Sequence, residues 1–156
     1  MTVRDDLYAN LVGDTALNAL LVGGVHTNSL IDRQLTPGAF DANNEIRPCS
    51  LLRVETEVPV GGGGAAIGGG SVGGFTSSYM GRDAARLYVL VYFYQRRGYD
   101  VIRQARARVF ALWHEARIGA ATWQIFWADD VSDQIDEALG CSLDMSRYMV
   151  VHARQP

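Results

Sequence analysis

A pattern typical of serine hydrolases stands in the most unusual part of the chain, the glycine-rich stretch 61–81. The sequence Gly69-Gly-Ser-Val-Gly73 fits the G-x-S-x-G spacing, in which a turn between a strand and a helix presents the serine as a nucleophile. Ten of the chain's 17 glycines fall in this stretch, so such a match is expected by chance. Because no strand and helix are predicted around Ser71, a small serine hydrolase is kept only as a distant alternative.

Other residue types that carry chemistry show no catalytic or metal-binding spacing. His26, His114 and His152 are far apart, and residues 113–117 contain one histidine where a zinc-binding helix needs two. The glycines lack the lysine of a phosphate-binding loop, and the acidic run 129–137 lacks the pattern of a calcium loop. We therefore expect no catalytic residue, no metal and no cofactor, and we predict that the chain is not an enzyme.

The charges of the chain are unevenly distributed. The formal net charge is −3, which argues against a protein that holds nucleic acid through a basic surface. All 14 basic residues are arginines, and a coding bias is the simplest reason for the missing lysine. Arginine binds carboxylates and phosphates through paired hydrogen bonds, so a cluster of arginines reflects either this bias or a face for an acidic partner. Six arginines lie in or beside one predicted helix: Arg96, Arg97, Arg103, Arg106, Arg108 and Arg117.

The two cysteines, Cys49 and Cys141, are far apart in the sequence and have no metal-ligand spacing. The chain begins with an acidic segment rather than the apolar core of a signal peptide, and no run approaches the ~18 apolar residues of a membrane span. We expect reduced, buried thiols in a protein that is made in a cytoplasm and has no membrane contact.

The strongest secondary-structure signals stand next to each other and form one β-α unit. Residues 86–95 are apolar or aromatic on both alternating faces, which predicts a central strand covered on both sides. Residues 100–117 carry apolar side chains at three- and four-residue spacing, which predicts a helix that packs on this sheet. Gly98 marks the turn between the two elements, and Asp100 is the predicted N-cap of the helix.

The rest of the chain supplies further elements of an α+β fold. Thr2 is expected to cap a first short helix, and Asp14 a second one that ends at Gly23-Gly24. The remaining expected elements are a long loop over 25–48, strands over 49–58, 122–127 and 145–154, and a short helix over 132–139. We predict a single domain over residues 1–156, with one small, mostly antiparallel β-sheet, packed helices and a long glycine-rich loop inserted at 61–81.

The order of these features resembles the tail terminator proteins of long-tailed bacteriophages and related phage-like particles, which complete the tail and join it to the head. The resemblance rests first on the N-terminal pattern Leu7-Tyr-Ala-Asn-Leu-Val-Gly-Asp-Thr-Ala-Leu-Asn-Ala-Leu-Leu-Val-Gly-Gly24. It continues with Arg47-Pro48 before a strand, the strand from Leu87 to Phe93 before a helix over 99–117, and a final strand from Arg147 to Ala153. The similarity leaves out the glycine-rich stretch and residues 128–142.

This resemblance implies a structural protein of the virion tail or neck, assembled in the cytoplasm of a bacterial host. It implies a homo-oligomeric ring, expected to have six subunits, that caps the tail tube protein and stops its polymerisation. The ring then presents a surface to the head-side connector or stopper protein, while genomic DNA passes through the lumen without sequence-specific binding. Another neck component, such as a head-completion or stopper protein, is the main alternative, and a nucleic-acid-binding module that uses the arginine-rich helix is the weakest.

Two sets of residues are expected to make contacts between subunits or with partners. The apolar and aromatic residues of the glycine-rich stretch are expected to reach a neighbouring subunit or tube ring by main-chain pairing, because glycine permits close backbone approach. They are Ile67, Val72, Phe75 and Tyr79. Arg103 and Arg106 are expected to pair across the subunit interface with acidic residues, namely Asp129, Asp130 and Asp133.

Overall fold

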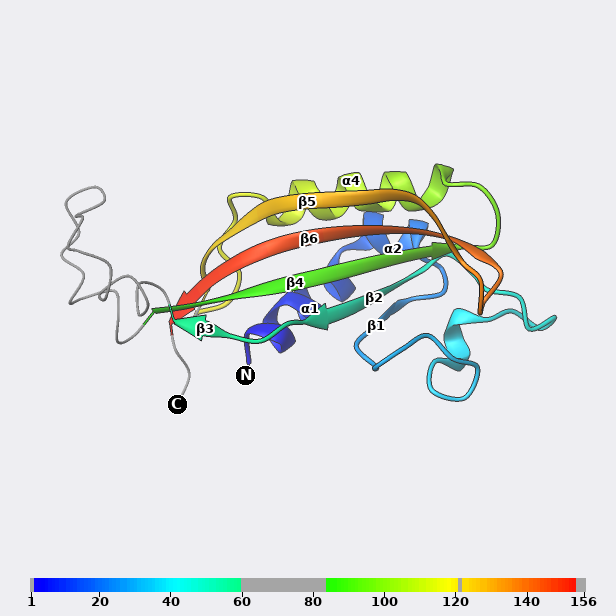
Figure 1. Cartoon of the computed structure of the whole chain (residues 1–156), viewed down its shortest axis with the longest axis horizontal. Coiled ribbons are helices and arrows are strands. Elements are labelled where there is room, and N and C mark those ends of the chain that lie inside the picture. Colours follow the sequence, from blue (N-terminus) through cyan, green and yellow to red (C-terminus); the bar gives the residue numbers. More distant parts are fainter. Residues whose placement is uncertain (1, 60–83, 121, 154–156) are drawn as a thin grey trace.

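The computed structural model describes residues 2–59, 84–120 and 122–153, which form one six-stranded sheet with three α-helices (Figure 1). The strand order is β1-β2-β4-β6-β5, and β3 pairs with β4. All pairs are antiparallel except β1 with β2. The elements are α1 (Val3–Gly13), α2 (Thr15–Leu20), β1 (Val25–His26), the 3-10 turn η1 (Pro37–Ala39), β2 (Cys49–Val54), β3 (Val58–Pro59), β4 (Ala84–Gln95), α4 (Asp100–Trp113), β5 (Thr122–Asp136) and β6 (Cys141–Ala153). The predicted α+β fold with a mostly antiparallel sheet is confirmed, and the glycine-rich stretch lies outside the described residues.

The two N-terminal helices begin where the sequence predicted. Thr2 and Asp5 form a reciprocal capping box at the start of α1, in which each side chain accepts a hydrogen bond from the other residue's backbone N–H. The Asp14 Oδ1 atom accepts the Leu17 N–H at 2.7 Å and caps α2. These caps orient two short helices whose leucines pack on the sheet.

Strand β4 is central, as predicted, because it pairs with β2 on one side and β6 on the other. The N-cap of α4 is Tyr99 rather than the predicted Asp100, and the Tyr99 side chain makes no capping hydrogen bond. Gln95, the last residue of β4, caps the helix instead. Its Oε1 atom accepts the Val101 and Ile102 N–H groups at 3.1 and 3.2 Å, and its Nε2 donates to the Asp100 carboxylate at 2.6 Å.

Helices α1, α2 and α4 all lie over one face of the sheet (Figure 1). Alternate β4 side chains, including Val89, Val91 and Phe93, point into this layer and are fully buried. Trp113 of α4 is also fully buried, and its Nε1 donates to the Asn10 Oδ1 atom of α1 at 2.9 Å. The main hydrophobic core therefore lies between the helices and this helix-facing side of the sheet.

The predicted helix over 132–139 is wrong, because β5 continues as a strand to Asp136. Pairing with β6 holds this segment extended, with Gln134 opposite Leu143 and Asp136 opposite Cys141. The predicted boundaries were too short for both strands, since β5 extends beyond residue 127 and β6 begins at Cys141. Long-range pairing outweighs the local helix propensity of the acidic segment.

The opposite face of the sheet, called the open face below, is covered at one end only, so the prediction of a strand covered on both sides is wrong for most of β4. At that end the predicted loop 25–48, which contains only β1 and η1, folds over the sheet in a second small core that includes Ile31, Leu51 and Tyr94. Cys49 and Cys141 are buried in this core and unpaired, and burial raises the pKa of each thiol to about 12. Reduced, buried thiols were expected from the sequence, and burial in apolar surroundings makes such thiols unreactive.

Candidate interaction surface

A network of charged side chains joins α4 to β5 and β6. The Arg106 Nη1 atom donates to the Asp144 Oδ2 atom at 3.2 Å and to the Ser132 Oγ atom at 2.6 Å. The Arg106 side chain is only 20% exposed, and Asp144 is fully buried. A buried carboxylate without a partner would destabilise the fold, so Arg106 stabilises the chain by pairing with Asp144.

Asp144 is the centre of the network and was missed from the sequence. Its Oδ1 atom accepts the Asp133 N–H at 2.9 Å, which fixes the backbone of β5 where Asp133 has a positive φ of 59°. Arg103 completes the network with an ion pair to Asp133 and a 4.0 Å approach to Asp144. Strand alternation could have identified it, because alternation in β6 places Asp144 on the helix-facing side of the sheet, beneath the arginines of α4.

The structure brings four of the five predicted charged contact residues together, but within one chain. Arg103 pairs with Asp133, and the Arg106 Nε atom lies 3.8 Å from the Asp130 Oδ2 atom. Asp129 points to the open face, where it pairs with Arg147 at 2.5 Å. That any of these residues contacts another subunit stays a prediction. The other predicted contact residues, Ile67, Val72, Phe75 and Tyr79, lie outside the described residues, as does Ser71.

The open face carries a band of half-buried apolar and aromatic side chains on its central strands. The Arg147 guanidinium lies 5.2 Å from the centre of the Tyr88 ring, so the Asp129–Arg147 pair is held over this band. Side chains that the register places on this face and that are only partly buried are Tyr88, Leu90, Tyr92, Met145 and Met149. Large apolar groups left half-exposed on adjacent strands are typical of an interaction surface.

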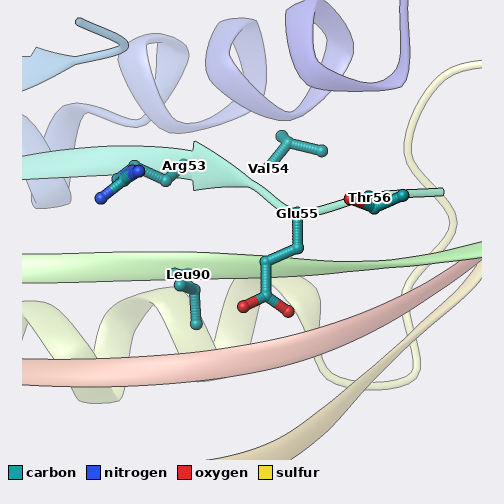
Figure 2. A pocket seen from close by; sticks show the side chains of 5 residues that line it. All are labelled: Arg53, Val54, Glu55, Thr56 and Leu90. Atoms are coloured by element: carbon teal, nitrogen blue, oxygen red, sulfur yellow. The ribbon is translucent and has the colours of Figure 1, made fainter. Parts of the chain in front are cut away.

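A hollow of about 550 Å³ lies at the edge of this band, where β2 ends beside β4. Figure 2 shows Arg53, Glu55 and Leu90 around it, with the Glu55 side chain extending across β4. It is open to solvent, and the residues that line it include no histidine, cysteine or serine. The hollow therefore extends the open face, and its lining gives Glu55 and Thr56 no histidine, cysteine or serine partner for catalysis.

Two kinds of site are absent from the part of the chain that the structure describes. No group of three or more His, Cys, Asp and Glu side chains there is placed to hold a metal ion. None of the described helices is long and apolar enough to cross a membrane.

Comparisons with known proteins show a similarity in fold. No protein-family model matches the chain, and no curated protein matches its sequence. A chain of the solved structure "Virion of native gene transfer agent (GTA) particle" aligns with it at a TM-score of 0.61 and 11% sequence identity. The two chains share one fold. The alignment covers 97% of this chain and 95% of the other, so the shared fold extends over nearly the whole length of both.

Proposed function

We propose that this chain is a structural protein of a phage-like virion, and specifically the tail terminator that caps the tail tube. The observation that supports this most strongly is the similarity in fold, over nearly the full length of both chains, to a chain of a gene transfer agent virion. The order of elements that resembles tail terminators includes the capped helix pair, the central β4–α4 unit and the final strand β6. These elements form a single sheet with its helices on one side, which leaves the other side for assembly.

The open face supports an assembly role. A ring subunit presents two lateral surfaces and two end surfaces, so it needs exposed apolar and aromatic groups. The band around Leu90 and Met149 supplies such groups, and Arg147 with Asp129 adds directional polar contacts to it. In the free chain these side chains are only partly buried, and we propose that neighbouring subunits or partner rings cover them.

The outer edge of β5 is unsuited to strand addition. Three register irregularities interrupt its pairing with β6, and acidic side chains are spread along it. Bulges and charges on an edge strand prevent edge-to-edge pairing. We therefore propose that neighbours associate through the open face and the loops, and that the β5 edge stays free.

In this proposal six copies form a ring that stops tube polymerisation and binds the head-side connector or stopper protein. Genomic DNA passes through the lumen without sequence-specific binding, in keeping with the net charge of −3. The same similarity in fold also suits a head-completion or stopper protein. Binding to tail tubes distinguishes the terminator, because a stopper binds the portal side.

Native mass spectrometry of the purified chain, with and without tail tubes, tests the proposal. We expect a six-subunit ring, or a monomer that becomes a ring only at tube ends. Negative-stain images of the same samples will show whether the ring sits at one end of the tube. A stable monomer or dimer that ignores tubes contradicts the terminator assignment.

A further inference from the structure

Strand β2 has an outer edge, the edge away from β4, that β1 covers only in part. β1 pairs with β2 at Ser50 and Leu51, whereas β2 runs on to Val54. In Figure 1, β2 accordingly continues past the short strand β1. No strand of the described part of the chain lies beside the rest of this edge. The uncovered part, residues 52–54, is called the free β2 edge below.

The main chain of the free β2 edge directs hydrogen-bonding groups outward. The Ser50 N–H donates to the Gly24 carbonyl at 3.0 Å, on the β1 side, and the Glu55 N–H donates to the Tyr88 carbonyl at 2.8 Å, on the β4 side. Because successive residues of a paired strand alternate in this way, Val54 directs its N–H and C=O away from β4. Neither group has a hydrogen-bond partner within the described residues. Both are therefore available to an added strand.

The free β2 edge lacks the features that protect the outer edge of β5. The residue pairs between β2 and β4 follow one another without irregularity, whereas three irregularities interrupt the pairing of β5. Residues 52–54 include one charged side chain, Arg53, whereas acidic residues are spread along β5. A regular edge with free main-chain groups is a site for strand addition. Pro59 has no N–H, so it limits the added strand to a few residues.

A hollow of about 300 Å³ lies along the free β2 edge and is open to solvent. Residues 52–54 form one side of it, and Arg4 of α1 and residues 27–29, which follow β1, form the others. The side chains of Thr27, Asn28 and Ser29 make no hydrogen bond within the described residues. The hollow therefore presents polar groups to a main chain that enters it.

The charges beside the hollow favour an acidic segment. Arg4 and Arg53 line it, and no carboxylate does. Both arginines are exposed and form no ion pair within the described residues. The acids next to them in the sequence are directed elsewhere, because Asp5 closes the capping box with Thr2 and Glu55 extends across β4 (Figure 2). A carboxylate on an incoming strand would thus gain arginine partners.

We infer that the free β2 edge binds an extended acidic segment of a partner protein, which adds to the sheet as a strand and offers a carboxylate to Arg4 and Arg53. The outward groups of Val54 bind any extended main chain, and the two arginines select an acidic one. The inference goes beyond the proposed ring, and its test needs neither a ring nor a tail tube. Failure of that test would therefore leave the proposed function standing.

Three capped peptides of five residues test the inference on the intact chain. The first is acetyl-Thr-Val-Glu-Val-Thr-amide, the second has Lys in place of Glu, and the third is the first with N-methyl groups on two adjacent residues. These methyl groups block one main-chain N–H on each edge of the peptide, so the third peptide cannot pair regularly as a strand. Binding is followed by the NMR shift of the Val54 amide.

We expect the glutamate peptide to bind in the millimolar range and at least threefold more tightly than the lysine peptide. The N-methylated peptide is expected not to bind. Failure of the glutamate peptide to bind overturns the inference, and so does equal or tighter binding of either other peptide.

Substitutions at the edge separate main-chain pairing from charge. Val54→Pro removes the outward N–H and leaves the pairing with β4, because proline is tolerated on an edge strand where its nitrogen faces outward. Val54→Thr keeps the N–H and the β-branched shape, so it is the matched control. We expect Val54→Pro to abolish binding of the glutamate peptide and Val54→Thr to retain it. Equal binding by the two variants overturns the inference.

A second variant tests the charge without changing the main chain. Arg4→Gln combined with Arg53→Gln replaces two exposed side chains, and circular dichroism checks that the fold is retained. We expect this variant to lose the preference for the glutamate peptide over the lysine peptide while still binding both weakly. An unchanged preference overturns the assignment of an acidic partner, whether or not Val54→Pro folds.

Discussion

Asp14 holds three parts of the N-terminal region together. It ends α1, caps α2 through the Leu17 N–H and accepts two hydrogen bonds from Arg108 of α4, Nε to Oδ1 at 3.1 Å and Nη2 to Oδ2 at 2.6 Å. The Arg108 side chain, and then the Leu17 N–H, lower the pKa of this carboxyl below its usual value. The geometry is the bidentate pairing that arginine forms best with carboxylates.

Asp14→Asn is expected to reduce the free energy of unfolding by roughly 1 kcal/mol at neutral pH, because asparagine still caps the helix but loses the ion pair. The loss is small because the Arg108 side chain is 41% exposed and water screens the pair. The pKa of Asp14 is lowered on folding, so the stabilisation is present above the unfolded pKa of about 3.9 and is lost as the pH falls through the lower folded value.

Urea unfolding of both forms between neutral and acidic pH measures this contribution. The difference between wild type and Asp14→Asn should be largest near pH 7 and should vanish in strong acid. Asp41→Asn, at an exposed loop carboxylate whose hydrogen bonds stay within the loop, is the control. A difference that is independent of pH would contradict the role given to the ion pair.

Single residues were the least predictable feature from the sequence. The caps Thr2 and Asp14 were predicted correctly, because capping depends on neighbours a few positions away. Asp144 and Gln95 were missed, since each acquires its role from partners that only the folded sheet brings near. The sequence predicted that Arg103 and Arg106 pair with the acidic segment across a subunit interface. The structure contains such pairs within one chain.

At the scale of elements, the junction between β4 and α4 depends on Gln95. This buried side chain accepts the first free N–H groups of α4 and holds Asp100 in the first turn, where a carboxylate favours the positive end of the helix. Gly98, with φ of +72°, lets the chain turn sharply enough for Gln95 to reach back. One side chain thus joins the central strand to the longest helix of the described part.

Gln95→Ala is expected to destabilise the chain by roughly 1–2 kcal/mol, because it removes a helix cap and leaves buried N–H groups without a partner. The control is Gln104→Ala in the same helix, whose exposed side chain makes no hydrogen bond within the described residues. Denaturant unfolding measured by circular dichroism compares the two. Equal stability of the two variants would rule out the capping role.

Elements with strong local patterns were predicted well from the sequence, and those defined by pairing were not. Strand β4 and helix α4 have long runs of periodic apolar residues, so both were placed nearly correctly. The second half of β5 carries acidic residues without apolar alternation, and only β6 makes it a strand. Bulges such as the one between Val131 and Gln134 break the two-residue period on which the prediction depends.

At the scale of the whole molecule, helices cover one side of the sheet and leave most of the other open. The sequence of β4 alone predicted burial on both faces, and in the free chain Tyr88, Leu90 and Tyr92 are only partly buried instead. A subunit that assembles with others needs apolar and aromatic side chains that stay partly exposed until a neighbour covers them. The prediction from sequence is thus wrong for the free chain, and we propose that it holds in the assembled particle.

The most direct test of the proposed function is the length of tail tubes grown in its presence. Tail tube protein from the same particle is polymerised in vitro with and without the chain, and the tubes are imaged by electron microscopy. If the chain is the terminator, tubes become shorter as its concentration rises, and each ends in a six-fold ring. Leu90→Arg, which charges the open face, should abolish both effects. Ile135→Ala, at a β5 side chain that is 70% exposed and lies outside the open-face band, is the control and should retain them. Tubes of unchanged length with bare ends would contradict the assignment.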